Sequence, residues 1–376
     1  MMKELSYKIK NLHWTFILSV IFLSVVGLVM IYSASHAEGM KATYSQMLKL
    51  LLAIVIMFVV ALINISFWQK YAYVIYFFGI LLLIYATFYG YIGKGARRWI
   101  DLGIFNLQPS EIMKIFLVLA LAKFFAERKI ESFKDYIFLI LPIILIIIPF
   151  LIILNQPDLG TGLVLLLLGL IVFFVVGISM KFFIFTFLFG LILTPFIWDL
   201  LHNYQKQRLL TFFSPYEDPQ GTGYHIIQSE IAIGSGGFFG KGWLKGTQSH
   251  LDFLPEKKTD FIFSMLGEEF GFIGTLSIVG LFLLICFTGY LISNNIEKSF
   301  FSKILGISLI SNFFIAGALN MSMVMGLMPV VGIPLPLVSY GGSSLVMYFI
   351  GFGLILSIDL TYKMNKEKNL TNIPFF

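Results

Sequence analysis

The chain has 376 residues, of which 58% are hydrophobic and only 12% are charged, and its formal net charge is +6. Soluble globular domains carry about 25% charged residues, so this composition excludes a water-soluble fold of this size. We therefore expect an integral membrane protein and attribute the positive charge mainly to cytoplasmic anchoring residues, not to nucleic-acid binding.

Apolar blocks of about 20 residues recur along the chain, which is the length that an α-helix needs to cross the hydrocarbon core. Alternating strands of the outer-membrane barrel type are absent, so we predict an all-α polytopic fold with about ten transmembrane helices. The predicted spans are 14–33, 47–65, 71–91, 110–126, 136–154, 160–178, 182–200, 266–292, 304–325 and 343–362.

These spans would form a single transmembrane domain over residues 1–376, with a large extracytoplasmic loop, about 201–260, between spans seven and eight. An even number of spans places both termini on one side. Cations flank both ends of the chain, and by the positive-inside rule they put that side in the cytoplasm. These cations are Lys3, Lys8 and Lys10 near the start and Lys363, Lys366 and Lys368 near the end.

The loop 91–110 would face outward, yet it contains Lys94, Arg97 and Arg98. The positive-inside rule does not explain three cations in a short outer loop. One interpretation is contact with anionic lipid headgroups. The other is a binding site for an anionic substrate such as a phosphate, and composition favours neither.

Ionisable residues inside a span normally mark function, because each costs roughly 2.5–3.5 kcal/mol or more. Glu111 and Lys114 lie three residues apart in the fourth span, so they share a helical face and can pair. The pair would either fix helix packing or line an extracellular cavity. Asp158 lies just before the sixth span and could cap the N-terminus of that helix.

Asp260 closes the long loop at the membrane surface, just before apolar sequence. Partial desolvation of a carboxylate raises its pKa toward that of a general base. The alternatives are a helix N-cap or an ordinary surface acid. Glu256, Glu268 and Glu269 are nearby competitors for the catalytic role.

The stretch 326–342 contains three prolines and three glycines between residues 328 and 344, which predicts non-helical backbone at membrane depth. Such backbone is tolerated only when it is buried in protein or lines a cavity, so we expect a re-entrant segment that shapes a pocket. Within the long loop, 224–233 could form an amphipathic interfacial helix.

Two other patterns do not qualify as sites. The stretch 235–242 resembles a phosphate-binding P-loop, but it lacks the first glycine, the final Ser or Thr and a preceding strand. The five histidines show no metal-ligand spacing, so we expect no structural zinc site.

Several segments together resemble the SEDS family (shape, elongation, division and sporulation), and its elongation branch more closely than its division branch. The segments are GKGARRW at 93–99, QPSE at 108–111 with Lys114, QPDLGTG at 156–162, GYHIIQS at 223–229, FLPEKKTDFIFS at 253–264 and PLPLVSYGGSS at 334–344.

The resemblance implies a peptidoglycan glycosyltransferase of the bacterial inner membrane that polymerises lipid II into β-1,4-linked glycan strands. It implies a class B penicillin-binding transpeptidase as partner within the elongation machinery. The family's essential carboxylate falls on Asp260, which would act as general base. The expected substrate-binding residues are Arg97, Arg98, Trp99, Glu111, Lys114, Asp158, Arg208 and Ser339.

In this scheme the arginines would hold the diphosphate of the substrate, and Trp99 would contact sugar or prenyl chain. Mg²⁺ or Mn²⁺ could bridge the diphosphate and a carboxylate, although the sequence supplies no dedicated ligand set. Two alternatives are a transporter that flips a lipid-linked precursor and a non-catalytic scaffold. Polymer formation from lipid II by purified protein in detergent separates an enzyme from a transporter, and a scaffold would tolerate replacement of Asp260, Arg98 and Glu111.

Overall fold

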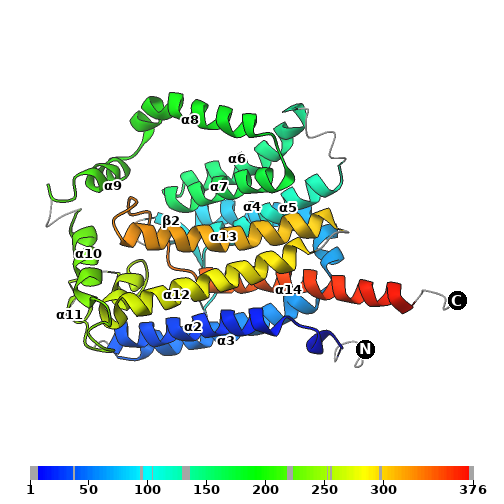
Figure 1. Ribbon diagram of the computed structural model, residues 1–376. Helices are drawn as coiled ribbons and strands as arrows, with labels where there is room; N and C mark the ends of the chain where they lie inside the picture. The colour runs from blue at the N-terminus through cyan, green and yellow to red at the C-terminus, as the bar shows by residue number, and fades with distance from the viewer. Residues whose placement is uncertain are drawn as a thin grey trace.

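The computed structural model describes residues 7–36, 39–93, 96–103, 105–128, 136–217, 223–251, 253–254, 256–295 and 299–371. Lys3 and Lys94, two of the cations considered above, lie outside these ranges. The long helices run roughly side by side as one bundle (Figure 1). In chain order they are α2 (Trp14–Ser35), α3 (Lys41–Leu62), α4 (Ile65–Tyr89), α5 (Pro109–Ala126), α6 (Ile140–Leu154), α7 (Leu159–Val176), α8 (Met180–Leu200), α12 (Ile262–Asn294), α13 (Phe300–Val324) and α14 (Gly342–Thr371).

Each predicted span coincides with one of these helices, which confirms the polytopic all-α fold. In the described part of the chain, eight spans are long and apolar enough to cross a membrane. The fifth of the predicted ten begins in the short 3-10 helix η3 (Tyr136–Leu139), which leads into α6. The two spans outside the eight are α5, which carries three ionisable side chains, and α8, whose apolar part is shorter (Met180–Phe196).

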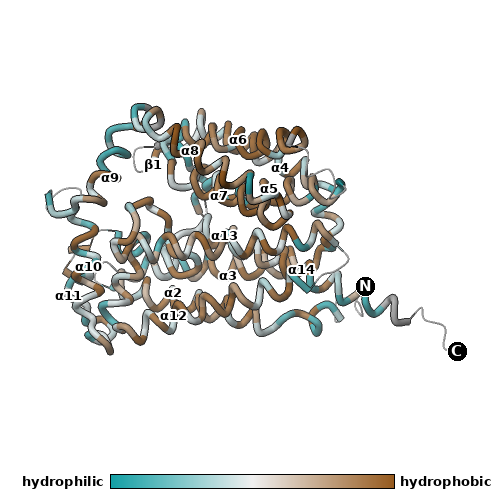
Figure 2. Tube along the Cα trace, turned by 45° about the horizontal axis from the view of Figure 1, so that its top comes forward, coloured by the Kyte–Doolittle hydropathy of each residue, from teal (hydrophilic) through white to brown (hydrophobic). Residues whose placement is uncertain are grey.

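The start of α2 and the end of α14 lie at the same end of the bundle (Figure 1). The opposite end, called the outer end below, carries three short helices from the predicted long loop. They are α9 (Asn203–Phe213), α10 (Tyr224–Gly236) and α11 (Thr247–His250). Figure 2 shows brown, apolar residues along most of the bundle and hydrophilic teal residues along α9 and towards the two ends. The predicted helix at 224–233 forms, but α10 buries Ile226, Ser229 and Ala232 and packs on α12.

The predicted outer loop 91–110 contains a small antiparallel sheet that the sequence did not indicate. Its strands are β1 (Tyr91–Gly93), β2 (Ala96–Asp101) and β3 (Asn106–Leu107), paired in the order β1-β2-β3. The sheet leads directly into α5, whose first residue is Pro109. A proline is well tolerated at the first turn of a helix, because the N–H that it lacks would have no helical partner there.

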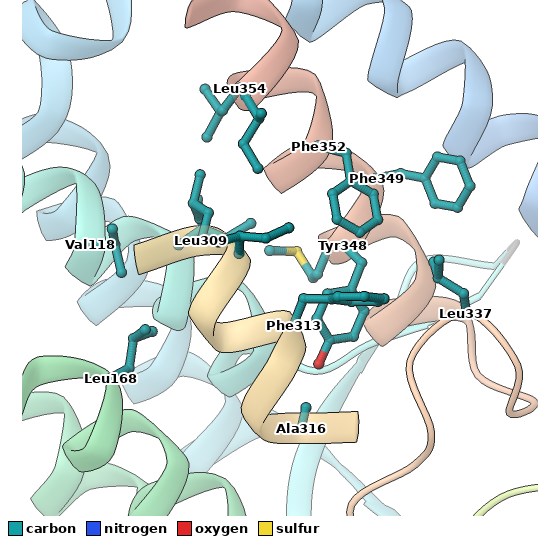
Figure 3. Packing of buried hydrophobic residues seen from close by; sticks show 14 of the residues in the cluster. Val118, Leu168, Leu309, Phe313, Ala316, Leu337, Tyr348, Phe349, Phe352 and Leu354 are labelled. Carbon is teal, nitrogen blue, oxygen red and sulfur yellow. The ribbon is translucent and has the colours of Figure 1, made fainter. Parts of the chain in front are cut away.

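Helix α13 lies at the centre of the core and packs against α5, α7, α12 and α14. Its Phe313 stacks on Phe282 of α12 with ring centroids 4.2 Å apart. The same ring meets Tyr348 and Phe352 of α14 edge-on, as Figure 3 shows. These aromatic contacts fix α13 and α14, which flank the non-helical segment between them.

Residues 326–341 connect α13 to α14 without regular structure, as predicted, and they are inserted into the bundle. Leu335, Leu337 and Val338 are each at most 4% exposed. Helix α2 makes room for them at Gly27, where an added Cβ would lie 2.6 Å from the Leu337 carbonyl oxygen and 2.7 Å from the Cα of Val338.

Replacing Gly27 with alanine should lower stability by about 1–3 kcal/mol, because the added methyl group collides with backbone that cannot move without shifting the inserted segment. Gly190 of α8 has no atom within 4 Å of an added Cβ, so Gly190→Ala is the matched control. Thermal unfolding in detergent should show a lower midpoint for the Gly27 variant only. Equal midpoints would contradict this packing.

Candidate active site

The inserted segment is hydrogen-bonded to the turn that carries Asp260. The backbone N–H of Tyr340 donates to the Lys258 carbonyl at 2.8 Å, and the Ser339 hydroxyl donates to the Thr259 carbonyl at 2.6 Å. The amide of Asn320, fully buried on α13, donates both to the Asp260 carbonyl at 2.8 Å and to the Ile333 carbonyl at 2.7 Å. The backbone at Asp260 is therefore held from two sides.

The side chain of Asp260 is half-buried and lies over Gly332 of the inserted segment. A Cβ added to Gly332 would lie 3.6 Å from Oδ2 of Asp260. The N-cap residue of α12 is Phe261 and not Asp260. Asp260 therefore does not occupy the N-cap position that the sequence suggested, and its carboxylate lies near Gly332.

Asp158 has the capping role that the sequence suggested. Its Oδ1 accepts from the Thr161 N–H at 3.3 Å at the start of α7. Its Oδ2 accepts from the Gln108 amide at 2.8 Å and lies 3.5 Å from Nη1 of Arg98. One nearly buried carboxylate thus joins α7, the β2 strand and the residue before α5.

Arg97 and Arg98 are neighbours on β2, so their side chains point to opposite faces of the strand. Arg98 turns inward to Asp158, with 19% of its side chain exposed and its Nε buried without a hydrogen-bond partner among the described residues. Arg97 is exposed and donates to the Phe88 carbonyl at 3.4 Å. Trp99 packs over Gly93 on β1. The structure therefore places Arg98, but neither Arg97 nor Trp99, beside Asp158.

Helix α9 brings Arg208 to the same place. Nη1 of Arg208 donates to the Val330 carbonyl at 3.4 Å, and the Tyr204 hydroxyl donates to the Pro157 carbonyl at 3.1 Å. The next residue of the segment, Val331, lies against the start of α7, since a Cβ added to Gly160 would be 2.8 Å from its carbonyl oxygen. Residues 330–332 are thus surrounded by Arg208, the N-terminus of α7 and the Asp260 carboxylate.

His225 is a site residue that the sequence considered only as a zinc ligand. Its ring stacks on Phe261, with centroids 6.0 Å apart, next to Asp260. Burial lowers the pKa of His225; the charge of Glu256 opposes this shift and that of Arg208 adds to it. Burial therefore disfavours the charged form of the ring. The GYHIIQS motif carries this residue, but only the fold reveals its place.

Ser339 braces the inserted segment. Its hydroxyl accepts from the Leu335 N–H at 2.8 Å and donates to Thr259, so backbone groups on both sides occupy it. Ser343 plays the same part at the start of α14, where it accepts from the Gln108 N–H at 2.9 Å and donates to the Asn106 carbonyl. These two hydroxyls tie the segment to the turn before α12 on one side and to the β3–α5 junction on the other.

The Glu111–Lys114 ion pair forms as predicted, with 2.9 Å between Oε1 and Nζ. The side chain of Lys114 is 5% exposed and that of Glu111 is 12% exposed. The pair lies in the first turns of α5, close in sequence to Gln108 and its bond to Asp158. Both earlier interpretations, packing and cavity lining, are compatible with this position.

Two of the three acids that compete with Asp260 are buried and hydrogen-bonded within the protein. Glu268 is fully buried and accepts from Lys241 at 2.9 Å and from the Ser249 hydroxyl at 2.7 Å. Glu269, 1% exposed, accepts from Ser33 at 2.5 Å and lies 3.1 Å from the His250 ring. Both carboxylates are buried and bonded to neighbouring side chains, which favours a structural role for each. Glu256 is exposed, with the Thr259 hydroxyl at 2.8 Å.

Comparison with known proteins identifies the family of this chain. The family of cell cycle proteins that includes FtsW, RodA and SpoVE matches residues 13–364. The chain belongs to this family. Its resemblance to SEDS proteins is thereby confirmed.

Relatives cover nearly the whole chain. Peptidoglycan glycosyltransferase MrdB of Escherichia coli K12 is 41% identical over 354 residues, which are 93% of this chain and 94% of MrdB. Stage V sporulation protein E of Bacillus subtilis is 36% identical over 354 residues, or 90% and 94% of the two chains.

Solved structures are similar too. RodA of Thermus thermophilus aligns with a TM-score of 0.70 at 28% identity, over 93% of this chain and 97% of that one. A chain of a peptidoglycan synthase complex, studied for its coordination of polymerization and crosslinking, aligns with a TM-score of 0.80 at 31% identity, over 93% and 97%.

Replacing Asp158 with alanine should destabilise the protein more than loss of an ordinary cap. Cap loss alone costs about 0.5–2 kcal/mol, and leaving Gln108 and Arg98 without their acceptor adds about 1–3 kcal/mol. Ser299, which accepts from the Ser302 N–H at 3.3 Å to cap α13, supplies the control Ser299→Ala. Chemical unfolding that ranks Ser299→Ala as equally or more harmful would refute the joining role of Asp158.

Proposed function

We propose that this chain is a peptidoglycan glycosyltransferase that polymerises lipid II into β-1,4-linked glycan strands, with Asp260 as general base. The activity is supported by the E. coli relative of that name and by the similarity to a chain of a peptidoglycan synthase complex. The observation that carries the residue assignment is the position of the Asp260 carboxylate over Gly332, among residues that Arg208 and the N-terminus of α7 also contact.

The chemistry requires a base and a cationic site at the leaving group. The donor sugar of lipid II is α-linked through diphosphate and the product is β-linked, so one displacement with inversion suffices. The 4-hydroxyl oxygen of the acceptor forms the new bond to the sugar C1, its proton passes to Asp260, and the bond from C1 to the diphosphate oxygen breaks. The diphosphate leaves with the bonding electrons. A positioned base of this kind contributes typically about 10²–10⁴-fold.

Two arginines, one on a strand and one on a helix, would stabilise the departing diphosphate. Arg98 reaches the site from β2, and Arg208 reaches it from α9. Guanidinium groups bind phosphate oxygens with fixed, charged donors, which is most effective where water is excluded. Asp158 orients Arg98, and Ser339 braces the segment beneath the substrate. Arg97 and Trp99, on the outer faces of the hairpin, would contact the lipid-linked substrate at the membrane surface, and the Glu111–Lys114 pair would shape the cavity electrostatically.

The described residues contain no group of three or more His, Cys, Asp or Glu side chains that could hold a metal ion. A resident metal site therefore does not fit these donors, and we derive no step through one. Mg²⁺ or Mn²⁺ would enter with the diphosphate, whose oxygens are the ligands that hard cations prefer.

The chain is a multi-pass membrane protein, and we place it in the bacterial inner membrane with both termini in the cytoplasm. The cations Lys8, Lys10, Lys303 and Lys363 belong to the end of the bundle where α2 begins and α14 ends, which agrees with the positive-inside rule. A class B penicillin-binding transpeptidase is the proposed partner, supported by the similarity to a complex that couples polymerization to crosslinking. The names of the relatives do not favour a transporter.

Asp260→Asn should reduce lipid II polymerisation at least 100-fold, because the amide has the same size and cannot accept the proton. Binding of lipid II should stay within about threefold of wild type, since the charge of one base contributes little to ground-state affinity. Gel analysis of glycan strands made by the purified protein with its transpeptidase measures this. Glu256→Gln, an exposed acid on the same turn, is the control and should stay active; normal strand synthesis by Asp260→Asn would remove Asp260 from the mechanism.

Chelation with EDTA should slow polymerisation but leave the unfolding midpoint of the lipid-free protein unchanged, because the cation binds with the substrate and not with the fold. Differential scanning calorimetry and the strand assay, run on the same sample, test both parts. A midpoint that falls on chelation would instead indicate a resident metal site.

A further inference from the structure

Lys49 is a buried lysine on α3 that neither the ion pairs nor the proposed mechanism uses. Its side chain is 8% exposed, and its Nζ donates to the Tyr340 hydroxyl at 3.1 Å. The ammonium also lies over the Tyr340 ring, 4.4 Å from the centroid. Throughout the described part of the chain, no carboxylate lies within ion-pair distance of Lys49.

The neighbours of Lys49 belong to the inserted segment and the start of α14. On the same helix, Gln46 accepts from the Gly341 N–H at 3.3 Å and donates to the Ser339 carbonyl at 3.4 Å. The Lys49 side chain passes close to Gly342, where an added Cβ would lie 3.2 Å from its Cδ. The ammonium is therefore held at the glycine pair where α14 begins, and the N-terminus of a helix itself carries partial positive charge.

Tyr340 is fixed at two of its groups. Its hydroxyl accepts from Nζ of Lys49 at 3.1 Å, and its backbone N–H donates to the Lys258 carbonyl at 2.8 Å. The phenol that holds the ammonium is therefore anchored to the turn that carries Asp260.

The hydrogen bond from Lys49 to Tyr340 does not explain why a charged residue is buried at this position. A neutral glutamine could donate to the phenol equally well, whereas a buried ammonium without an opposite charge is costly. The cation–π contact with the Tyr340 ring offsets only part of this cost. A bound anion at the start of α14 would account for the buried charge.

We propose that Lys49 and Tyr340 form a second phosphate-binding site, which takes the diphosphate of a polyprenyl-linked substrate. This inference rests on the proposed function, because joining two lipid-linked sugars brings two diphosphates to one base. Arg98 and Arg208 serve the diphosphate that leaves. The Lys49 site lies on the α3 side of residues 339–341, and it serves the diphosphate that stays attached to the acceptor.

The decisive experiment measures binding of undecaprenyl diphosphate, which carries no sugar, to the purified full-length protein by native mass spectrometry. Lys49→Met should weaken one of two binding events by about 10–100-fold, since hydrogen bonds to charged groups contribute about 1.5–3 kcal/mol. Lys49→Arg should stay within about threefold of wild type. In the strand assay Lys49→Met should raise KM for lipid II and leave kcat within about threefold, because the acceptor diphosphate does not react.

Lys123→Met is the control. Lys123 is a partly buried lysine of α5 near the other end of the bundle, where it donates to the Lys70 carbonyl at 2.9 Å. Tyr340→Phe provides a second test, because it keeps the charge but removes the atom that orients it, and it should weaken binding less than Lys49→Met does. If Lys49→Met also lowers the unfolding midpoint, recovery of binding in Lys49→Arg still supports the site, and its absence overturns it.

Competition identifies the source of the phosphate. Phosphatidylglycerol or inorganic diphosphate that displaces undecaprenyl diphosphate from the Lys49-dependent event at equal concentration would overturn the proposal. Unchanged binding and KM in Lys49→Met would overturn it as well, with the polymerase function intact. If wild-type protein makes no glycan strands but still binds undecaprenyl diphosphate in a way that Lys49→Met weakens, the Lys49 site stands and the proposed polymerase function is rejected.

Discussion

The backbone of residues 326–341 must find all its hydrogen-bond partners inside the protein, because a lipid environment offers none. The structure meets this requirement with side chains of α3, α13 and the segment itself, and a serine of α14 anchors the end of the segment. Asn320 serves the Ile333 carbonyl, Ser339 serves the Leu335 N–H, Gln46 serves residues 339 and 341, and Ser343 connects the end of the segment to β3 and α5. Each of these side chains also restrains a second element, so satisfying the segment assembles the site.

Asp260 is positioned by the same bonds. Its carbonyl shares the Asn320 amide with Ile333, and the two preceding carbonyls accept from Tyr340 and Ser339. A base held through its own backbone keeps its position when its side chain gains a proton. The cations, in contrast, come from the hairpin and from α9, and α9 follows α8, a helix whose apolar side chains are largely exposed. The acid is therefore fixed to the core, whereas Arg208 depends on a more loosely packed part of the chain.

Sequence patterns identified the helices, because block length and hydropathy alone determine a transmembrane fold. They also identified Asp158 as a cap and Glu111–Lys114 as a pair, since both are local relations along one helix. They could not separate Arg97 from Arg98, because the two differ only through the alternation of a strand that the sequence did not reveal. The glycine-rich stretch at 235–242 resembled a phosphate loop, but its glycines allow close backbone approach: a Cβ on Gly240 would lie 2.1 Å from the Glu269 carbonyl oxygen.

Lys49 shows most clearly what only the fold can supply. Lys49 is the third residue of the predicted span 47–65, and lysines near the end of a span normally extend toward water. The helix instead begins at Lys41, so Lys49 lies two turns inside it, where the inserted segment covers its side chain. For Asp158 and Glu268, hydrogen bonds and nearby cations account for the charge. For Lys49 the described protein groups supply a phenol and no opposite charge. Asp158 and Glu268 are therefore explained by the fold alone, whereas the charge of Lys49 is explained by a bound anion.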